Sequence, residues 1–398
     1  MKVLQLCNKP PYPPVDGGSI AMNSITQGLL SLGCQVKVLS AYSYKHPILS
    51  SAISEDYTNK THFEAVCFDL KARPLKALEC LLSGRSYHIE RFINKEFEER
   101  LIATLKDSSF DIVHLESLFL TPYVKIIRKY SDAKIVLRSH NVEHLIWQQI
   151  AKRCKNPIKR WYLKHLSLTL KVYELEHLND YDGIAAISGK DADFFKQNGL
   201  KKPKITIPLG ITPQLSTDEP LIEQNSLYHI GAMDWMPNQE GIEWFMEKVW
   251  ALVAEKLPQT KLYLAGRKMP ESFFKYNTLY SNVSVEGEID DISNFVKTKQ
   301  INIVPLLSGS GIRVKIIEAM SLGKVVITTT IGAEGINYKD GVHLLIADAP
   351  EKFVEQIEKC INEKNLCCEI GNNARQLIAD EYDNEKLTQK LIDFYKRI

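Results

Sequence analysis

The sequence has almost no excess charge of either sign and no long hydrophobic run. Its 398 residues include 50 basic and 48 acidic side chains, which gives a formal net charge of +2. A chain without a basic excess has no general attraction for nucleic acid, and we expect no such partner. No apolar segment approaches the length of a membrane span, and the apolar run after Met1 is too short for a signal peptide. A cytoplasmic protein is therefore expected.

The cysteines also lack a pattern that would predict a metal site or a disulfide framework. Eight are present, without a C-x-x-C pair or histidines at zinc-ligand spacing. Scattered thiols are typical of a reducing compartment. Asp191 and Asp193 resemble a metal-binding Asp-x-Asp pair, but their position at a helix start favours interaction with the helix dipole. We expect no essential metal.

The composition that is present indicates a folded α/β protein of two domains. Hydrophobic residues make up 44% of the chain and charged residues 25%, and the length exceeds what one core usually holds. Short β-branched runs alternate with segments of helical periodicity, which predicts parallel sheets built from βαβ units. The predicted strands are residues 3–7, 36–39, 112–115, 135–137, 184–187, 205–207, 227–230, 262–265, 283–285, 301–304 and 325–328.

A polar stretch that begins with Pro208 and Gly210 interrupts this alternation. It predicts a boundary between two doubly wound domains, residues 1–207 and residues 208–383. Residues 384–398 follow as a helix with Leu387 and Leu391 on one face. We expect this helix to pack back towards the N-terminal domain.

Two glycine-containing loops follow predicted strands, where doubly wound sheets bind ligands and helix N-termini favour phosphate. The first contains Gly17 and Gly18 and opens the first predicted helix. Paired glycines allow a diphosphate to approach the backbone closely. A plain turn capped by Ser19 is an equally good interpretation.

The second loop contains Gly309, Ser310 and Gly311, and it leads into a helix that carries Lys315 and Glu318. Helical spacing places Gly311, Lys315 and Glu318 on one face, a set suited to two phosphates and a ribose diol. The alternative is an exposed ion pair between Lys315 and Glu318. Arg313 would join this face only if the first helical turn is irregular.

Together these residues resemble the retaining nucleotide-sugar glycosyltransferases of family 4, also called glycosyl transferases group 1. The resemblance implies the GT-B fold, in which two Rossmann-like domains face a cleft. The matching motifs keep their order along almost the whole chain: Asp16-Gly17-Gly18, Arg138 to Glu143, Ile187-Ser188, Gly231 to Asn238, Leu264-Ala265-Gly266, Val285-Glu286-Gly287, Gly309 to Lys315, Glu318-Ala319-Met320 and Gly332 to Gly335.

The resemblance also implies roles for individual residues. The N-terminal domain would hold the acceptor and the C-terminal domain the nucleotide sugar, with UDP or GDP as the carrier and no cofactor. Charge on the leaving diphosphate would be stabilised by Lys315 and Arg313, and His140 would orient the donor sugar or the acceptor. The implied donor-binding residues are Gly17, Gly18, Val285, Glu286, Gly309, Ser310, Gly311 and Glu318, with Glu318 on the ribose hydroxyls and Val285 and Glu286 near the base.

The sequence departs from the family pattern at several positions. Ser310 replaces the usual first glutamate, and Ala232 and Glu240 lie near the places of the usual diphosphate-gripping Arg and Lys. Glu116 stands where relatives often have the second histidine of a His-x-His pair that begins at His114, and its role is open. These departures indicate a variant subgroup.

A basic segment over residues 152–171 is the one strong local charge feature. Seven Lys and Arg residues alternate there with aromatic and leucine residues, and no acidic residue interrupts them. This pattern is typical of a helix that docks on an anionic membrane surface, so a peripheral position at the inner face of the plasma membrane is expected. A basic helix that packs its leucine face on the domain is the alternative. Arg85 and Arg91 mark another acceptor-side region.

The function expected from these observations is retaining transfer of a hexosyl-type sugar to a saccharide or lipid-linked acceptor, in the synthesis of a surface polysaccharide or glycolipid. Two alternatives stay open. A nucleotide-sugar epimerase shares the architecture, and the missing first glutamate is compatible with a catalytically silent module that binds a nucleotide sugar or a protein partner. Fold alone does not separate these functions.

Overall fold

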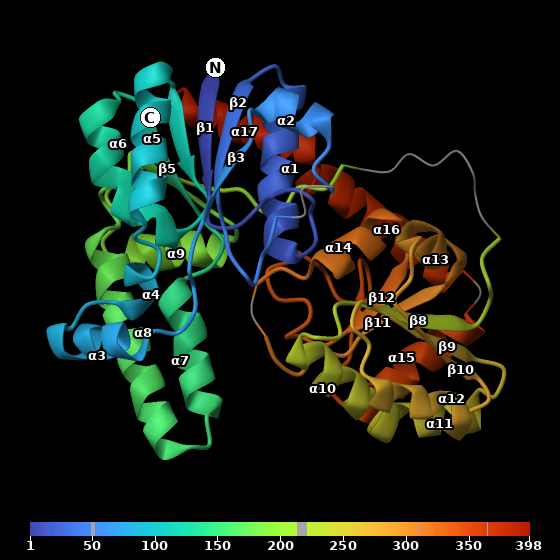
Figure 1. Cartoon of the computed structure of the whole chain (residues 1–398). Coiled ribbons are helices and arrows are strands. Elements are labelled where there is room, and N and C mark those ends of the chain that lie inside the picture. Colours follow the sequence, from blue (N-terminus) through green and yellow to red (C-terminus); the bar gives the residue numbers. More distant parts are fainter. Residues whose placement is uncertain (49–51, 213–220, 310, 364) are drawn as a thin grey trace. The chain divides into compact units, whose positions relative to one another are not determined.

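The computed structural model describes residues 1–48, 52–212, 221–309, 311–363 and 365–398. The chain forms two compact units (Figure 1). The first comprises Met1–Gly210 together with Asn384–Ile398, and the second comprises Ile211–Asp383. The division falls after Gly210, where the sequence predicted a boundary after residue 207, and the C-terminal segment belongs to the first unit.

The described part of the first unit contains a seven-stranded parallel sheet in the order β3-β2-β1-β4-β5-β6-β7. β1 lies inside the sheet and pairs with both β2 and β4, so that Val3 is in register with Val36 on one side and Ile112 on the other. The strands are β1 (Lys2–Cys7), β2 (Gln35–Tyr42), β3 (Glu64–Cys67), β4 (Ile112–Leu115), β5 (Lys134–Ser139), β6 (Gly183–Ala186) and β7 (Lys204–Thr206).

Hydrophobic clusters cover both faces of this sheet, as expected for strands whose residues are apolar on both sides. One cluster joins Leu4 and Val113 to Phe97 of α5 (Lys95–Asp107), and the other joins Val3 and Val36 to Leu391 of α17 (Asn384–Tyr395). The helices are α1 (Gly17–Ser31), α2 (Glu55–Thr61), α3 (Pro74–Ser83), α4 (Tyr87–Glu90), α5 (Lys95–Asp107), η2 (Leu118–Tyr123), α6 (Val124–Tyr130), α7 (Glu143–Arg153), α8 (Pro157–Glu176), α9 (Gly189–Gln197) and α17 (Asn384–Tyr395).

The second unit has a six-stranded parallel sheet, within its described residues, in the order β10-β9-β8-β11-β12-β13. Its strands are β8 (Ser226–Ile230), β9 (Lys261–Ala265), β10 (Val283–Gly287), β11 (Ile301–Val304), β12 (Val325–Thr328) and β13 (Leu345–Ile346). The helices are α10 (Met236–Phe245), η3 (Met246–Trp250), α11 (Ala251–Lys256), η4 (Glu271–Phe274), α12 (Lys275–Leu279), α13 (Ile292–Thr298), α14 (Val314–Ser321), α15 (Pro350–Asn362) and α16 (Leu366–Glu381). Both units are thus doubly wound Rossmann-like domains, as the sequence predicted.

The strand order brings the carboxyl ends of β8 and β11 together. The two strands are neighbours in the sheet although about 70 residues separate them in the chain. The loop after β8 leads into α10, and the glycine-containing loop after β11 leads into α14. Residues from these two loops and helices therefore lie close together at the carboxyl ends of the strands.

Candidate functional site

The loop before α14 requires backbone conformations that favour glycine. Gly309 and Gly311 have φ values of 119° and 83°, in the region where a side chain is strained. Ser310, which the sequence places between them among the donor-binding residues, lies outside the described residues. Arg313 precedes the first helical residue with extended backbone, φ −89° and ψ 96°. The chain therefore enters α14 from a glycine-shaped loop whose amides adjoin a helix N-terminus.

Lys315 reaches across to β8 and α10. Its Nζ donates to Oδ1 of Asn238 at 2.7 Å and lies 3.3 Å from Nε2 of His229. Burial, followed by the nearby charge of Arg313, lowers the pKa of Lys315 to about 7. A poorly solvated amine with this pKa gains much from an anion placed beside it.

The buried His229 fixes the environment of that amine. Its Nδ1 lies 2.7 Å from the carbonyl oxygen of Ile303. Because a carbonyl can only accept, Nδ1 carries the proton and Nε2 presents its lone pair to Lys315. Burial and the charge of Lys315 hold the pKa of His229 well below its usual value. A neutral His229 therefore orients Lys315 without adding charge to the site.

Glu318 lies one turn further along α14 and is exposed. Surrounding protein atoms nevertheless desolvate its carboxyl group and raise its pKa. Among the described residues no ion pair joins Glu318 to Lys315, whose ammonium donates to Asn238 and lies near His229. The simple surface pair that the sequence allowed is not formed, and Glu318 stays available for a ligand.

Arg313 is buried against an aromatic ring and the glycine loop. It is 5% exposed, its guanidinium lies 5.7 Å from the Trp235 ring centroid, and Nη1 donates to the carbonyl oxygen of Gly311. Burial lowers its pKa, and Glu334 opposes that effect. The extended backbone at Arg313 supplies the irregular start that the sequence analysis required. Its side chain braces the glycine loop beside Lys315.

The two residues expected near the nucleotide base lie on β10, at the edge of the sheet. The Val285 side chain is buried in the core, and its backbone N donates to Oδ1 of Asn277 at 2.7 Å. Glu286 is exposed and accepts from the Ser284 hydroxyl at 2.7 Å. Strands β9 and β8 lie between β10 and β11 in the sheet.

In the first unit, Gly17 and Gly18 form the start of α1 behind an Asp16 N-cap. Asp16 and Ser19 make a reciprocal capping box, as in the plain-turn interpretation. Lys9 Nζ lies 2.5 Å from Asp16 Oδ1, and a Cβ added at Gly18 would lie 2.7 Å from that Nζ. The structure thus adds a cation, Lys9, that the sequence analysis did not identify. Because Gly18 has no side chain, the ammonium group of Lys9 can lie beside it.

His140 follows β5 in the first unit and contacts a buried carboxylate. Its Nε2 lies 2.9 Å from Oε2 of Glu116, and the His140 side chain is 17% exposed. Burial lowers the pKa of His140, and the positive charge of Arg138 acts in the same direction, whereas Glu116 opposes both. His140 is therefore a partly accessible, neutral imidazole at neutral pH.

The Asp-x-Asp pair lies on α9. Ser188 caps α9 by accepting from the Asp191 backbone N at 3.1 Å, and Asp193 pairs with Lys204 at 2.9 Å. Among the residues that the structure describes, no three His, Cys, Asp or Glu side chains gather as they would around a metal ion.

The basic segment forms the end of α7 and most of α8. Its leucines Leu163, Leu166 and Leu170 are buried, so they are core residues. A second apolar stripe is exposed on the other side of α8, where Ile158 is 79% and Trp161 59% exposed, and Leu168 and Val172 continue it. Arg160, Lys164 and Lys171 are exposed along one flank of this stripe. None of the helices among the described residues is long and apolar enough to cross a membrane.

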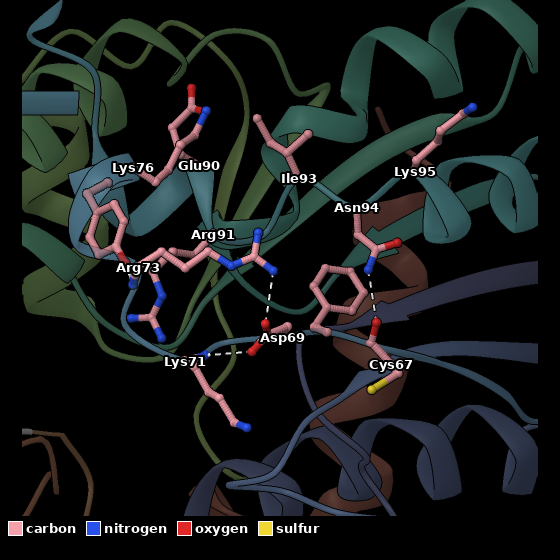
Figure 2. Close-up of a pocket in the computed structure, with 12 residues that line it drawn as sticks. Cys67, Asp69, Lys71, Arg73, Lys76, Glu90, Arg91, Ile93, Asn94 and Lys95 are labelled. Carbon is pink, nitrogen blue, oxygen red and sulfur yellow. Dashed lines mark hydrogen bonds and ion pairs between the residues drawn. The ribbon is translucent and has the colours of Figure 1, made fainter. Parts of the chain in front are cut away.

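A pocket of about 550 Å³ lies between the end of β3, α3, α4 and the start of α5 (Figure 2). It is lined by several cations, but most have partners nearby. Arg73 pairs with Asp69 at 2.9 Å and Lys76 with Glu90 at 3.3 Å, while Arg91 donates to the Leu70 carbonyl oxygen. Arg85, outside the lining, also pairs with Glu90 at 3.0 Å. Arg73 and Lys76 are therefore paired with carboxylates, whereas Arg91 contacts a neutral carbonyl group.

Several solved structures with the same architecture match this chain over its whole length. Sucrose-phosphate synthase from Thermosynechococcus elongatus has a TM-score of 0.71 at 14% identity and covers 100% of this chain and 99% of its own. HepE from Anabaena, solved with UDP, has a TM-score of 0.69 at 14% identity and covers 100% of both chains. A glycosyltransferase from Rickettsia africae has a TM-score of 0.60 at 18% identity, covering 100% and 98%. The fold of the protein is GT-B.

The second unit also carries a family match. Residues 224–363 match the family described as glycosyl transferases group 1, and this segment includes β8, α10, the glycine loop and α14. A relative from Klebsiella pneumoniae, described as an uncharacterized 44.6 kDa protein in a cps region, is 24% identical over 397 residues, which are 97% of each chain. Family match and fold together support sugar transfer.

Proposed function

We propose that the protein is a retaining glycosyltransferase of family 4 that moves a hexosyl-type sugar from UDP or GDP to a saccharide or lipid-linked acceptor. The observation that carries this proposal is the arrangement at the start of α14. A glycine-shaped loop, a poorly solvated amine and an accessible carboxylate follow one another within ten residues, from Gly309 to Glu318. Nucleoside diphosphates offer the matching groups, namely phosphate oxygens and a ribose diol.

The chemistry assigned to Lys315 follows from its surroundings. The diphosphate gains negative charge as the bond to the sugar breaks, and an ammonium held by Asn238 stabilises that charge without prior reorganisation. The leaving diphosphate itself accepts the proton of the incoming hydroxyl in the front-face route, so no enzyme nucleophile is required. Arg313 is proposed to add a second positive charge toward the leaving diphosphate, and His140 is proposed to orient a sugar.

Two comparisons support the substrate classes. HepE has been solved with UDP and with UDP-glucose, which favours a uridine carrier for the donor. The Klebsiella pneumoniae relative lies in a cps region, which favours synthesis of a surface polysaccharide or glycolipid. Both assignments are proposals for this chain.

A thermal-shift panel of UDP, GDP, ADP and their sugars tests the proposed donor class. A ligand at a hundredfold its dissociation constant adds about 2.7 kcal/mol to the free energy of unfolding, and we expect this from one nucleotide family, also in excess chelator. Incubation of the matching nucleotide sugar with and without saccharide acceptors then separates transfer from epimerisation. Failure of every nucleotide to bind would refute the donor site.

The exposed stripe of α8 is proposed to rest on an anionic membrane surface. Trp161 and Ile158 supply apolar side chains for the interface, and Arg160, Lys164 and Lys171 supply charge that complements anionic lipid. Helix α3 of the same unit has a further exposed apolar face, where Leu75 is 84% and Leu82 81% exposed. Peripheral binding would bring a lipid-linked acceptor to the first unit.

A further inference from the structure

The buried carboxylate of Glu116 is the centre of a polar cluster in the first unit. Glu116 follows β4 and is fully buried. Its Oε1 accepts from Nε2 of Gln5 at 2.7 Å and lies 3.3 Å from Nε2 of His114. Its Oε2 lies 2.9 Å from Nε2 of His140 and 3.6 Å from Nη1 of Arg138.

Every other member of this cluster is tied to the protein interior. Arg138 Nη1 donates to the carbonyl oxygen of Ala21 at 2.7 Å, and Nδ1 of His114 lies 2.6 Å from the Tyr395 hydroxyl on α17. Gln5 accepts from the Thr26 hydroxyl at 2.7 Å. Among the described side chains that contact the Glu116 carboxylate, only His140 is partly exposed.

Burying a charged group is expensive, and an apolar core would be at least as stable. Although burial opposes ionisation, Arg138 and the two histidines keep the pKa of Glu116 below its ordinary value. The carboxylate is therefore ionised and acts as a hydrogen-bond acceptor. An ionised carboxylate beside Nε2 of His140 requires a proton on that nitrogen.

We propose that Glu116 is a positioning residue that holds His140 in the Nε2–H tautomer, so that Nδ1 accepts a hydrogen bond from a hydroxyl group of a sugar substrate. The sugar part of this inference rests on the proposed function. Within the described residues no hydrogen bond occupies Nδ1 of His140. This proposal gives Glu116 the role that the sequence left open.

The charged groups around His140 determine how it titrates. Glu116 at the end of β4 favours the imidazolium, whereas Arg138 on β5 and Lys9 in the loop before α1 disfavour it, as does burial. His114 contacts the same carboxylate from β4. Replacing Glu116 by glutamine removes the favourable charge and leaves the unfavourable ones, so the pKa of His140 should fall.

The first test reads the tautomer in the free protein by nitrogen NMR of ¹⁵N-histidine-labelled samples, with His140→Gln for assignment. The expected result at pH 7 is a neutral imidazole protonated at Nε2. A neutral Nδ1–H form or an imidazolium would overturn the inference. This measurement needs no turnover, so it is readable even if the proposed function fails.

The second test uses Glu116→Gln with Glu174→Gln as the matched control. Glu174 is also buried, and it contacts His144 Nδ1 at 2.6 Å in the same unit, so both variants place a neutral amide beside a histidine. In Glu116→Gln the acidic limb of the kcat/KM profile should move to lower pH and kcat/KM should fall about tenfold or more. An unmoved limb, or the same movement in Glu174→Gln, would overturn the role of Glu116. If the parent protein transfers no sugar while the Nε2–H tautomer is present, only the proposed function is lost.

Discussion

Nζ of Lys315 lies 2.7 Å from Oδ1 of Asn238, across the gap between the starts of α14 and α10. The contact joins the two loops that follow the neighbouring strands β8 and β11. It holds the amine in one place, and Asn238 is neutral, so the positive charge is not cancelled. The ammonium group of Lys315 can therefore bind an anionic ligand, and it is not engaged in a surface ion pair.

This arrangement predicts how the reaction depends on pH. The pKa of Lys315 is about 7 because burial disfavours its charged form. As pH rises through 7, the free enzyme loses the ammonium, and kcat/KM for the donor should decline by at most about tenfold per pH unit. In Lys315→Met this limb should be absent. A profile that is the same in both proteins would show that another group titrates there.

Loss of Lys315 should affect turnover more than donor affinity. An interaction that strengthens as charge develops acts mainly on the chemical step. We expect Lys315→Ala to lower kcat by about 100-fold or more, with a smaller change in the dissociation constant of the diphosphate. Saturating-donor kinetics and calorimetry measure the two quantities. Asn238→Ala, which removes the neutral partner, should show the same pattern more weakly.

A change of Glu318 should lower nucleotide affinity more than turnover, because its proposed ligand is the ribose. Glu318→Gln keeps the shape of the side chain but replaces a charged acceptor by a neutral one. Nucleotide affinity should fall by about 1.5 to 3 kcal/mol, measured by calorimetry with the diphosphate that the panel identifies. The raised pKa of Glu318 also predicts weaker binding by the parent protein as pH falls and the carboxylate gains a proton. Unchanged affinity in Glu318→Gln would place the ribose elsewhere.

Gly309 allows the loop conformation to be tested separately from its charges. With φ at 119°, alanine is strained, and its Cβ would lie 3.0 Å from Nη2 of Arg313. Gly84, with φ 68° and no atom within 4 Å of an added Cβ, is the control for backbone strain alone. Both alanine variants should lose about 1 to 3 kcal/mol of stability. Only Gly309→Ala should lose nucleotide binding in the thermal-shift assay, and retention of full binding would argue against loop amides as ligands.

The fold was largely predictable because its strands are buried on both faces. Val3 and Ile112, for example, lie in continuous β-branched or leucine-rich runs, and such runs stand out from helical periodicity. Two strands were missed, β3 and β13, and both lie at sheet edges. β3 is partly exposed and begins with Glu64, and β13 has two residues. Neither provides an apolar run long enough to be recognised.

The site was predictable only in part, since its contacts join distant segments. The glycine loop, Lys315 and Glu318 follow one another in the chain, so helical spacing predicts their grouping. His229 and Asn238 approach Lys315 only because β8 and β11 are neighbours. Asn238 belongs to a motif shared with the family, which was the available signal, whereas His229 had none.

The basic segment shows the same limit of sequence periodicity. One interpretation of the sequence was that the leucine face packs on the domain, and Leu163, Leu166 and Leu170 are indeed buried. Helical spacing identifies an apolar stripe but does not say which of two stripes faces the core. The packing of α8 against the rest of the first unit determines that the stripe through Ile158 and Trp161 is the exposed one.

That exposed stripe leads to a prediction about anionic liposomes, which can be measured by co-sedimentation. The triple change of Lys155, Lys159 and Arg160 to glutamate should abolish binding, because it reverses three exposed charges on and beside α8. The matched control reverses Lys196, Lys201 and Lys202, which are exposed elsewhere in the same unit, and should bind nearly as the parent does.

The apolar contribution is tested separately, by changing Ile158 and Trp161 to serine. This variant keeps every charge, so it should still bind at low salt, but its binding should disappear at a salt concentration that the parent protein tolerates. Charge attraction is screened by salt, whereas insertion of apolar side chains is not. Equal loss in both charge-reversal variants would mean that net charge alone attracts the protein to lipid. The stripe on α8 would then have no part in membrane docking.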